Sequence, residues 1–386
     1  MSLVVILLAS MVAQSFGRFT YPVLLKAIND DLLGSLSKAG TLGTVSLAAY
    51  LVGTAVVSWL STRTEPGRLI KVGLAASAIG LALLATSTGF LSLAAGLFVA
   101  GLGSAAVWVP APGLAATIVG PERGGMAIGV VGSGIGLGIF VVGPLTNLVR
   151  QSAGVGAWRP VYAIETVVAV VVAVVVVVFI GAPAQTNRSA ASKVSTTVIR
   201  DVPGWGWLLA CFALFGAGYS LFFYFFVTQL QDAGWSSSST NLVSSLLGLA
   251  SVCGGVTFGR LSDRWGRPPL ILAGFLIMAS APLLALSASL IPVLLAAVGF
   301  GLCVSGTPTA IGALVADHLQ GRAFGAAFGS LTFVFGGAQL LGPQIGGTVA
   351  DRTGSFVPAF LAASVLSCAG AACAWCLGRQ ERTASR

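Results

Sequence analysis

The chain has 386 residues, of which 56% are hydrophobic and only 8% are charged, and its formal net charge is +9. A soluble domain carries about a quarter of its residues as charged ones, so this sequence has too few charges to cover a water-exposed surface of that size. A water-soluble fold is thereby excluded, and the composition predicts an integral membrane protein surrounded by the lipid bilayer.

Long apolar runs divide the chain into candidate membrane-spanning helices. Crossing about 30 Å of hydrocarbon requires roughly 20 residues, and no polar insert is long enough to form a soluble domain. We therefore predict an all-helical membrane protein with twelve transmembrane helices. The predicted spans are 3–27, 40–60, 69–88, 92–117, 126–149, 159–181, 204–228, 239–258, 269–287, 291–316, 324–349 and 358–378.

The first predicted span carries an arginine inside its apolar run. No basic residue precedes this run, as one would in a secretory signal, so the segment is interpreted as a retained helix. At about 1.5 Å per residue, Arg18 lies roughly 22–24 Å from the inner surface. A charge at membrane depth costs about 2.5–3.5 kcal/mol on insertion scales, which makes it a functional candidate. Tyr21 lies one helical turn further on.

The fourth and sixth spans add polar candidates to the first half. Trp108 lies beside Pro110, and prolines within a span expose backbone carbonyls to a cavity. Glu165 lies about 10 Å deep from the outer side, at a level similar to that of Arg18. Arg18 therefore has two roles open to it, which are not exclusive. It can bind a substrate carboxylate through its planar guanidinium, or it can form a structural ion pair with Glu165.

The two halves of the chain repeat at an offset of 199 residues. Arg123 precedes Pro144 by 21 residues, and Arg322 precedes Pro343 by the same spacing. The only extended polar stretch, 182–203, lies between them and is predicted to be a linker. The halves 1–181 and 204–386 would then hold six helices each. Two parallel repeats of this kind can rock about a central site and expose it to either side in turn.

The loop between the eighth and ninth spans, "GRLSDRWGRPPL", gathers an aspartate and three arginines around a glycine turn. It resembles the signature Gly-x-Leu-x-Asp-Arg-x-Gly-Arg of the major facilitator superfamily, and the twelve spans fit that superfamily throughout. The resemblance implies a secondary transporter that works by alternating access. The corresponding loop of the first half, "STRTEPGRLI", lacks the aspartate. By resemblance, the cytoplasmic latch would be formed by Gly259, Asp263, Arg264, Gly266 and Arg267.

The resemblance also implies which helices line the central cavity. The first span lines it from one half, and the seventh and tenth spans line it from the other. The seventh span offers two tyrosine hydroxyls on an aromatic stretch, "GYSLFFYFF". Glu165 is the candidate for proton coupling, because coupling needs a group whose pKa changes with its surroundings. The candidate substrate-binding residues are Arg18, Tyr21, Trp108, Tyr219, Tyr224 and Thr307.

The basic residues report membrane topology. With the N-terminus inside, fourteen of the twenty lysines and arginines fall on cytoplasmic segments, which is the bias of the positive-inside rule. We therefore expect both termini in the cytoplasm and a multi-pass protein in the cytoplasmic membrane of a bacterium. This placement accounts for the net charge without nucleic acid. The six cysteines all fall in apolar segments without metal-ligand spacing and are expected to be inert packing residues.

The sequence has no phosphate-binding glycine loop with lysine, no metal cluster and no nucleophile paired with a base. An enzyme and an ATP-driven pump are therefore not expected, and no cofactor or metal is predicted. We expect a monomer that moves a small organic solute, a monocarboxylate in view of Arg18, and that is driven by protons. Proton-driven efflux of hydrophobic drugs is one alternative, although Leu145-Thr146-Asn147 replace the paired glycines that typify such antiporters. A non-transporting membrane sensor or scaffold is another.

Overall fold

The computed structural model describes residues 2–61, 63–119, 124–154, 156–179, 202–319 and 321–384. Every regular element within these ranges is a helix, so the predicted all-helical fold is confirmed. The helices of the first half are α1 (Ser2–Ser10), η1 (Met11–Phe19), α2 (Thr20–Ile28), η2 (Asn29–Leu33), α3 (Leu36–Leu60), α4 (Pro66–Ala85), α5 (Phe90–Trp108), α6 (Ala111–Val119), α7 (Gly124–Ala153) and α8 (Arg159–Phe179). Those of the second half are α10 (Trp205–Phe223), α11 (Phe226–Asp232), α12 (Ser237–Trp265), α13 (Arg267–Leu286), α14 (Leu290–His318), α15 (Gly321–Gln339), α16 (Gly342–Thr353) and α17 (Val357–Ala384).

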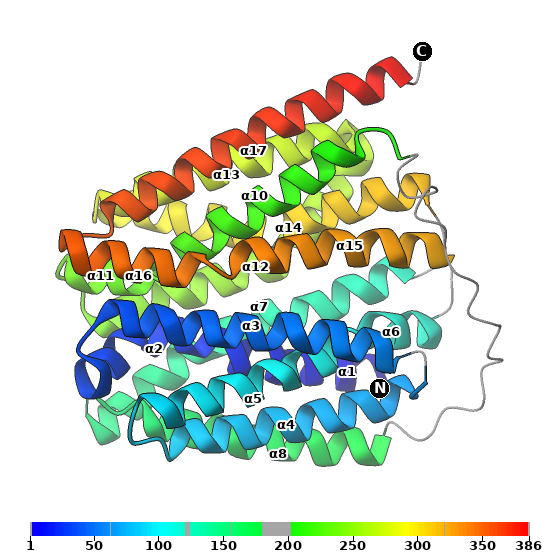
Figure 1. The fold of residues 1–386 in the computed structure, drawn as a ribbon. Helices are drawn as coiled ribbons and strands as arrows, with labels where there is room; N and C mark the ends of the chain where they lie inside the picture. The colour runs from blue at the N-terminus through cyan, green and yellow to red at the C-terminus, as the bar shows by residue number, and fades with distance from the viewer. Residues whose placement is uncertain are drawn as a thin grey trace.

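Among the described residues, eleven helical stretches are long and apolar enough to cross a bilayer. They coincide with eleven of the predicted spans. The first is longer than predicted, because it continues to Leu33 through the π-helical segments η1 and η2. The remaining predicted span, 324–349, is interrupted where α15 gives way to α16. These two helices lie end to end in Figure 1 and together follow the path of one span.

A proline explains the interruption. Pro343 has no N–H to donate to the carbonyl of Gln339, four residues earlier, and its ring crowds that carbonyl. Pro144 holds the equivalent position in the sequence repeat, yet it stays inside the continuous helix α7. The two halves therefore differ in their backbone at a place where their sequences correspond.

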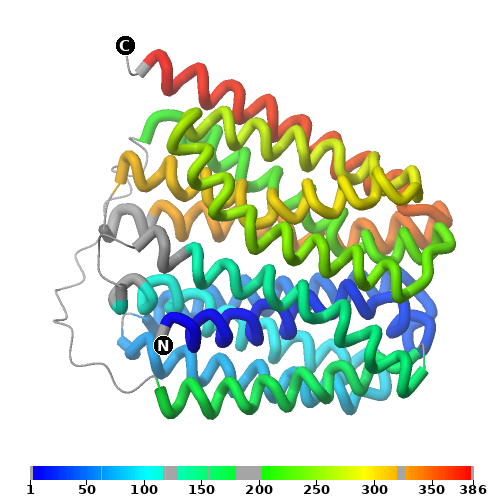
Figure 2. Tube along the Cα trace, turned by 180° about the vertical axis from the view of Figure 1, so that it is seen from behind, coloured from blue at the N-terminus to red at the C-terminus, as the bar shows by residue number. Residues whose placement is uncertain are grey.

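The helices run side by side between two faces of the molecule (Figures 1 and 2). We call the face that holds both chain ends the terminal face, and the other the opposite face. Helices α1–α8 form a first group and helices α10–α17 a second group, and the two groups meet mainly where α7 contacts α12 and where α3 contacts α16. The predicted linker, 182–203, lies outside the described residues except for Val202 and Pro203.

Glycines let the two groups approach closely. A β carbon added at Gly143 of α7 would overlap Asn241 and Ser245 of α12. One added at Gly347 of α16 would overlap the backbone carbonyl of Leu36 at the start of α3. Small residues at such crossings are how helices pack in a membrane, where apolar side chains gain little by leaving lipid. The closest approach of the two groups thus lies toward the opposite face.

Asp351 of α16 reinforces this closure by capping the first turn of α3. Its carboxylate accepts hydrogen bonds from the backbone N–H groups of Leu36 at 2.9 Å and Ser37 at 2.8 Å, and from the Ser35 hydroxyl at 2.6 Å. Partial burial acts to raise the pKa of Asp351, which lies beyond the predicted span, but these hydrogen bonds outweigh it and lower the pKa below 3.8. The cap therefore persists at neutral pH and is lost only as the pH falls below that value.

Two further polar contacts join the groups near the opposite face. Lys26 of α2 forms an ion pair with Asp232 of α11 at 2.5 Å. The Asn241 side-chain amide of α12 donates a hydrogen bond to the side-chain oxygen of Asn147 on α7 at 2.8 Å. Together with the Asp351 cap, these contacts close the opposite face in this conformation.

Substituting Gly347→Val should separate α3 from α16, because the added β carbon would overlap the Leu36 carbonyl. The Ser37 and Thr348 hydroxyls lie 3.2 Å apart across this contact. In a background without the six native cysteines, we expect disulfide formation between Ser37→Cys and Thr348→Cys to fall severalfold. Gly337→Val is the matched control, since no atom lies within 4 Å of its added β carbon. Equal disulfide yields in the two variants would contradict this account.

Candidate functional site

Arg18 lies in the π-helical segment η1 and is only 6% exposed. Single π-helical turns are rare and are frequent at functional sites. The Arg18 Nη1 atom donates a hydrogen bond to the Gln14 side-chain oxygen at 3.1 Å. The guanidinium lies over the ring of Tyr50 from α3, 3.9 Å from the ring centroid, which is a favourable cation–π arrangement.

No carboxylate pairs with Arg18 within the part of the chain that the structure describes. Its Nε atom is buried and has no hydrogen-bond partner there. The alternative in which Arg18 forms an ion pair with Glu165 is therefore absent from this conformation. A buried charge without a counter-ion is strongly unfavourable, so this site is electrostatically prepared for an anion.

Glu165 of α8 is completely buried. Its Oε1 atom accepts a hydrogen bond from the Thr20 hydroxyl at 2.6 Å, while its Oε2 atom has no partner among the described residues. Thr20 follows Arg18 by two residues and begins α2. The carboxyl group and the guanidinium are thus connected through the backbone at the junction of η1 and α2, and not by direct contact.

Two predicted substrate-binding residues of the first group have other neighbours. The Tyr21 hydroxyl donates a hydrogen bond to the Ala39 carbonyl at 2.8 Å and so ties α2 to α3. Trp108 is half-buried at the end of α5, directly before a backbone interruption at Val109 and Pro110. The Tyr21 hydroxyl is already occupied in this conformation, and Trp108 packs against the apolar core.

The second group contributes an aromatic wall that faces Arg18. The Tyr219 ring of α10 stacks on Phe300 with centroids 5.8 Å apart and on Phe223 with centroids 5.4 Å apart. The Phe223 ring in turn contacts Phe19, with ring centroids 5.3 Å apart, and the Arg18 guanidinium lies 5.6 Å from the Phe19 ring centroid. Neither tyrosine hydroxyl makes a hydrogen bond to another described residue. The aromatic wall thus reaches the surroundings of Arg18 through Phe223 and Phe19.

Thr307 does not join this cluster. It is fully buried, and its hydroxyl fills the space beside Gly274 of α13, next to the Phe258 ring. Gly274 leaves room for a side chain at that point, so Thr307 packs inside the second group between α13 and α14. The role of Thr307 in substrate binding stays a prediction.

Two irregular backbone segments of the second group meet at α3: the break between α10 and α11, and the break between α15 and α16. A β carbon added at Gly43 of α3 would overlap both Tyr224 and Pro343. Tyr224 lies at the break between α10 and α11, and Pro343 lies just after the break between α15 and α16. Gly342 faces Ser220 of α10. Interrupted helices in the middle of the membrane mark the substrate sites of secondary transporters, because the interruptions free backbone and polar groups for a ligand.

Two hollows lie elsewhere and are poor candidates. One, between the groups, is small and almost entirely apolar, and is lined by Pro22, Val23, Ile139, Phe223, Phe226, Val227, Ser244 and Leu247. The other is a shallow hollow of about 780 Å³ at the terminal face, lined by Val202, Pro203, Gly204, Trp205, Gly206, Trp207, Ala210 and Gln380. Neither contains Arg18.

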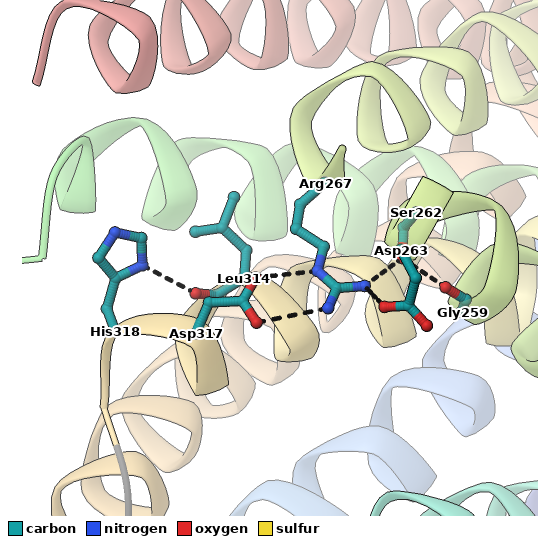
Figure 3. A network of polar contacts seen from close by, with 7 residues as sticks. All are labelled: Gly259, Ser262, Asp263, Arg267, Leu314, Asp317 and His318. Carbon is teal, nitrogen blue, oxygen red and sulfur yellow. Dashed lines mark hydrogen bonds and ion pairs between the residues drawn. The ribbon is translucent and has the colours of Figure 1, made fainter. Parts of the chain in front are cut away.

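The predicted latch lies on the terminal face (Figure 3). Gly266 makes the turn between α12 and α13 with a backbone φ of 90°, a conformation that favours glycine. The Arg267 Nη1 atom pairs with Asp263, and its Nε atom donates to Asp317 of α14 at 2.9 Å. Arg264 is exposed and forms no ion pair with another described residue.

These latch contacts stay within the second group, where they tie the beginning of α13 to the ends of α12 and α14. Gly259 lies inside α12, and its carbonyl accepts a hydrogen bond from Ser262 at 2.8 Å. Of the five predicted latch residues, Asp263 and Arg267 form the ion pair and Gly266 the turn.

Comparison with known proteins establishes the family. Residues 10–374 match the model of a family described as "Uncharacterised MFS-type transporter YbfB". The chain belongs to this family of major facilitator superfamily transporters. It is therefore a multi-pass integral membrane transporter and not an enzyme, as the sequence predicts.

Individual relatives are more distant. Monocarboxylate transporter 13 of Rattus norvegicus is 25% identical over 351 residues, which cover 86% of this chain and 78% of that protein. Multidrug resistance protein MdtG of Citrobacter koseri is 36% identical over 164 residues, which cover 41% of this chain and 40% of that protein.

Two solved structures share the fold. A bacterial homologue of the human lysosomal transporter Spinster, inward-facing and occupied, aligns with a TM-score of 0.75 at 16% identity, over 98% of this chain and 96% of that one. A mutant of the nucleoside transporter NupG aligns with a TM-score of 0.75 at 11% identity, over 97% and 99%. The predicted superfamily fold is thus confirmed.

Three residues of the site region were not among the predicted site residues: Gln14, Tyr50 and Gln339. Gln14 precedes Arg18 by four residues, a spacing that places two side chains on one helix face, so the sequence offered a signal for it. Gln339 precedes Pro343 by four residues, which marks the carbonyl that the proline leaves without a donor. Tyr50 had no such local signal.

Replacing Arg267 with glutamine should destabilise the terminal face, because one side chain serves both Asp263 and Asp317. We expect a loss of about 1–2 kcal/mol, which lowers the melting temperature by about 1–2 °C in a chain of 386 residues. Arg264→Gln is the control and should leave the melting temperature unchanged, since Arg264 is exposed and unpaired. Thermal unfolding of the two purified variants in detergent gives the comparison, and equal melting temperatures would refute the bridging role.

Proposed function

We propose that this chain transports a small organic anion, a monocarboxylate, across the bacterial cytoplasmic membrane by alternating access of the site at Arg18. The observation that carries the proposal is the burial of Arg18 without a counter-ion at the meeting of the two helix groups. A substrate carboxylate would supply the missing charge. The planar guanidinium binds a carboxylate through two parallel hydrogen bonds, and the Tyr219 and Tyr224 hydroxyls offer further donors.

Several observations support this choice of substrate. The Nε atom of Arg18 has no partner, so a hydrogen-bond donor is available in addition to the charge. Phe19, the neighbour of Arg18, contacts Phe223 of the other helix group, so an anion bound at Arg18 would lie near the meeting of the two groups. Distant relatives that cover most of the chain carry the name monocarboxylate transporter.

We propose that protons couple to transport through Glu165. Its carboxyl group is completely buried and its Oε2 atom lacks a partner, and burial of an ionised carboxylate without a cation is very costly. Thr20 holds the other oxygen at the junction of η1 and α2. An anion that pulls on Arg18 would move this junction and change the contact between Thr20 and Glu165. Proton binding and substrate binding would then be linked through one short backbone segment.

The proposal includes an orientation and a conformation. The excess of basic residues on the predicted cytoplasmic segments supports a terminal face, with both chain ends, that lies in the cytoplasm. The contacts of Asp351, Lys26 and Asn147 then close the outer side, so the site would communicate with the cytoplasm in this conformation. The ion pair between Asp263 and Arg267 would brace the second group while the halves move. The chain would function as a monomer.

Efflux of hydrophobic drugs is the second candidate. The aromatic wall of Tyr219, Phe223, Phe300 and Phe335 favours it, as does the partial likeness to MdtG. Movement of a lipophilic cation, blocked by a protonophore, would identify this function. Stabilisation by a ligand without any flux would instead identify a sensor.

Substitution of Arg18 tests the anion site. In liposomes with an imposed proton gradient, the wild-type protein should take up a short carboxylate from a labelled panel, and Arg18→Gln should reduce uptake at least about tenfold, because a charged hydrogen-bonded pair is lost. Arg18→Lys should fall between the two, since it keeps the charge and loses the planar fork. The control is Arg68→Gln, at an exposed arginine. If Arg18→Gln transports normally, the anion site lies elsewhere.

Substitution of Glu165 tests the coupling. Glu165→Gln should abolish the response of uptake to the proton gradient while leaving exchange of labelled for unlabelled substrate without a gradient, because the amide can still accept the Thr20 hydrogen bond but cannot release a proton. Glu65→Gln, at a partly exposed carboxylate on the terminal face, is the control. Accumulation that still follows the proton gradient in Glu165→Gln would exclude this residue as the coupling group.

A further inference from the structure

We propose that the substrate carries a second polar group, a hydroxyl or an oxo group, and that Gln339 binds it while Arg18 binds the carboxylate. This inference rests on the proposed function and narrows it from monocarboxylates in general to hydroxylated or oxo-substituted ones. Gln339 would be the specificity-determining residue of the second helix group.

The Gln339 side chain is buried without any partner. It is 1% exposed, and neither its Oε1 atom nor its Nε2 atom makes a hydrogen bond to another described residue. An amide removed from water normally finds partners, because leaving its donor and acceptor both unpaired is costly. A ligand that forms hydrogen bonds with both atoms of the Gln339 amide would remove this cost.

A series of aromatic contacts connects Gln339 to Arg18. Gln339 is the last residue of α15, directly before the break. One turn earlier, the Phe335 ring lies 6.3 Å from the Tyr219 ring. Tyr219 contacts Phe223, and Phe223 contacts Phe19, the neighbour of Arg18. On the other side of the break, Gly342 faces Ser220 of α10. Gln339 thus lies on the face of α15 that packs against the tyrosine-bearing part of α10.

The neighbouring residue Leu340 connects the same break to the first helix group. Its carbonyl accepts a hydrogen bond from Thr44 of α3 at 3.0 Å. Tyr50, whose ring faces the Arg18 guanidinium, lies further along α3. The end of α15 is therefore held between α10 and α3, and α3 is also the helix whose Tyr50 contacts Arg18. A ligand that binds both Arg18 and Gln339 would lie along α3 between these two residues.

Gln344, a second glutamine on the same interrupted span, differs from Gln339 because its side chain has hydrogen-bond partners. The Gln344 side-chain oxygen accepts a hydrogen bond from Thr41 at 2.6 Å, and its nitrogen donates to Thr348 at 3.2 Å. Gln344 therefore has a structural task between α16 and α3. The unpaired amide of Gln339 is a feature of its own position and not of glutamines in this span.

The Arg18 guanidinium and the Gln339 amide are the two polar ends of the proposed site, and they determine which substrate groups it can bind. An amide offers one acceptor and two donor hydrogens, so it can pair with a hydroxyl or with an oxo group. The aromatic wall of Tyr219 and Phe335 can cover the carbon chain between these two ends. An unsubstituted alkanoate would leave the amide unpaired, and a site built to hydrogen-bond a substrate group discriminates against the analogue that lacks it.

The test compares butyrate with 2-, 3- and 4-hydroxybutyrate as ligands of the purified full-length protein, by calorimetric titration. The wild-type protein should bind at least one hydroxybutyrate about tenfold more tightly than butyrate. The position of the preferred hydroxyl would report the spacing between Arg18 and Gln339. Equal affinities for all four compounds would overturn the inference while leaving the proposed function standing.

Two matched variants localise the effect. Gln339→Met keeps the length of the side chain and removes the amide, so the affinity ratio should fall to about one while butyrate binding is retained. Its melting temperature should not fall, because two unpaired buried groups are removed. Gln344→Met should keep the wild-type ratio. An unchanged ratio in Gln339→Met would overturn the assignment, and failure of every carboxylate to bind would overturn the proposed function together with this inference.

Discussion

The contact between the Arg18 guanidinium and the Tyr50 ring is the interaction around which the central region is built. It allows a full positive charge to remain deep in an apolar molecule, where only a ring face and one amide oxygen compensate it. Water would stabilise this charge far better. The burial of Arg18 is therefore an electrostatically unfavourable arrangement that the rest of the fold has to offset.

Irregular backbone accompanies that charge. The widened helix at η1 and the two breaks in α10–α11 and α15–α16 are each less stable than a continuous helix in a membrane, where every backbone group needs a partner within the protein. The residues of η1 and of the α10–α11 break are buried inside the molecule, whereas Leu341, at the α15–α16 break, is 58% exposed.

The sequence was sufficient to predict the positions of the membrane spans and the burial of Arg18 within the first of them. Long apolar runs, and a charge inside one of them, are strong signals. It was insufficient for the orientation of side chains. The packing of Thr307 beside Gly274 and the hydrogen bond from Tyr21 to Ala39 could not be predicted. Helices surrounded by apolar partners and by lipid have little periodic pattern that shows which face turns inward. The sequence shows Gln339 inside an apolar span but not its lack of a hydrogen-bond partner. That lack depends on how α15 packs against α10 and α3.

The division of one span into α15 and α16 makes the two halves structurally unequal, because the corresponding helix of the first half, α7, is continuous. Helix α16 holds α3 through Gly347 and Asp351, whereas α15 packs against α10 on the far side of the break. A bend of the backbone at Leu340 and Leu341 would change the angle between α15 and α16 without displacing the rest of the second half. The first half has no equivalent break, because α7 continues through Pro144. A displacement of α3 would then have different consequences in the two halves.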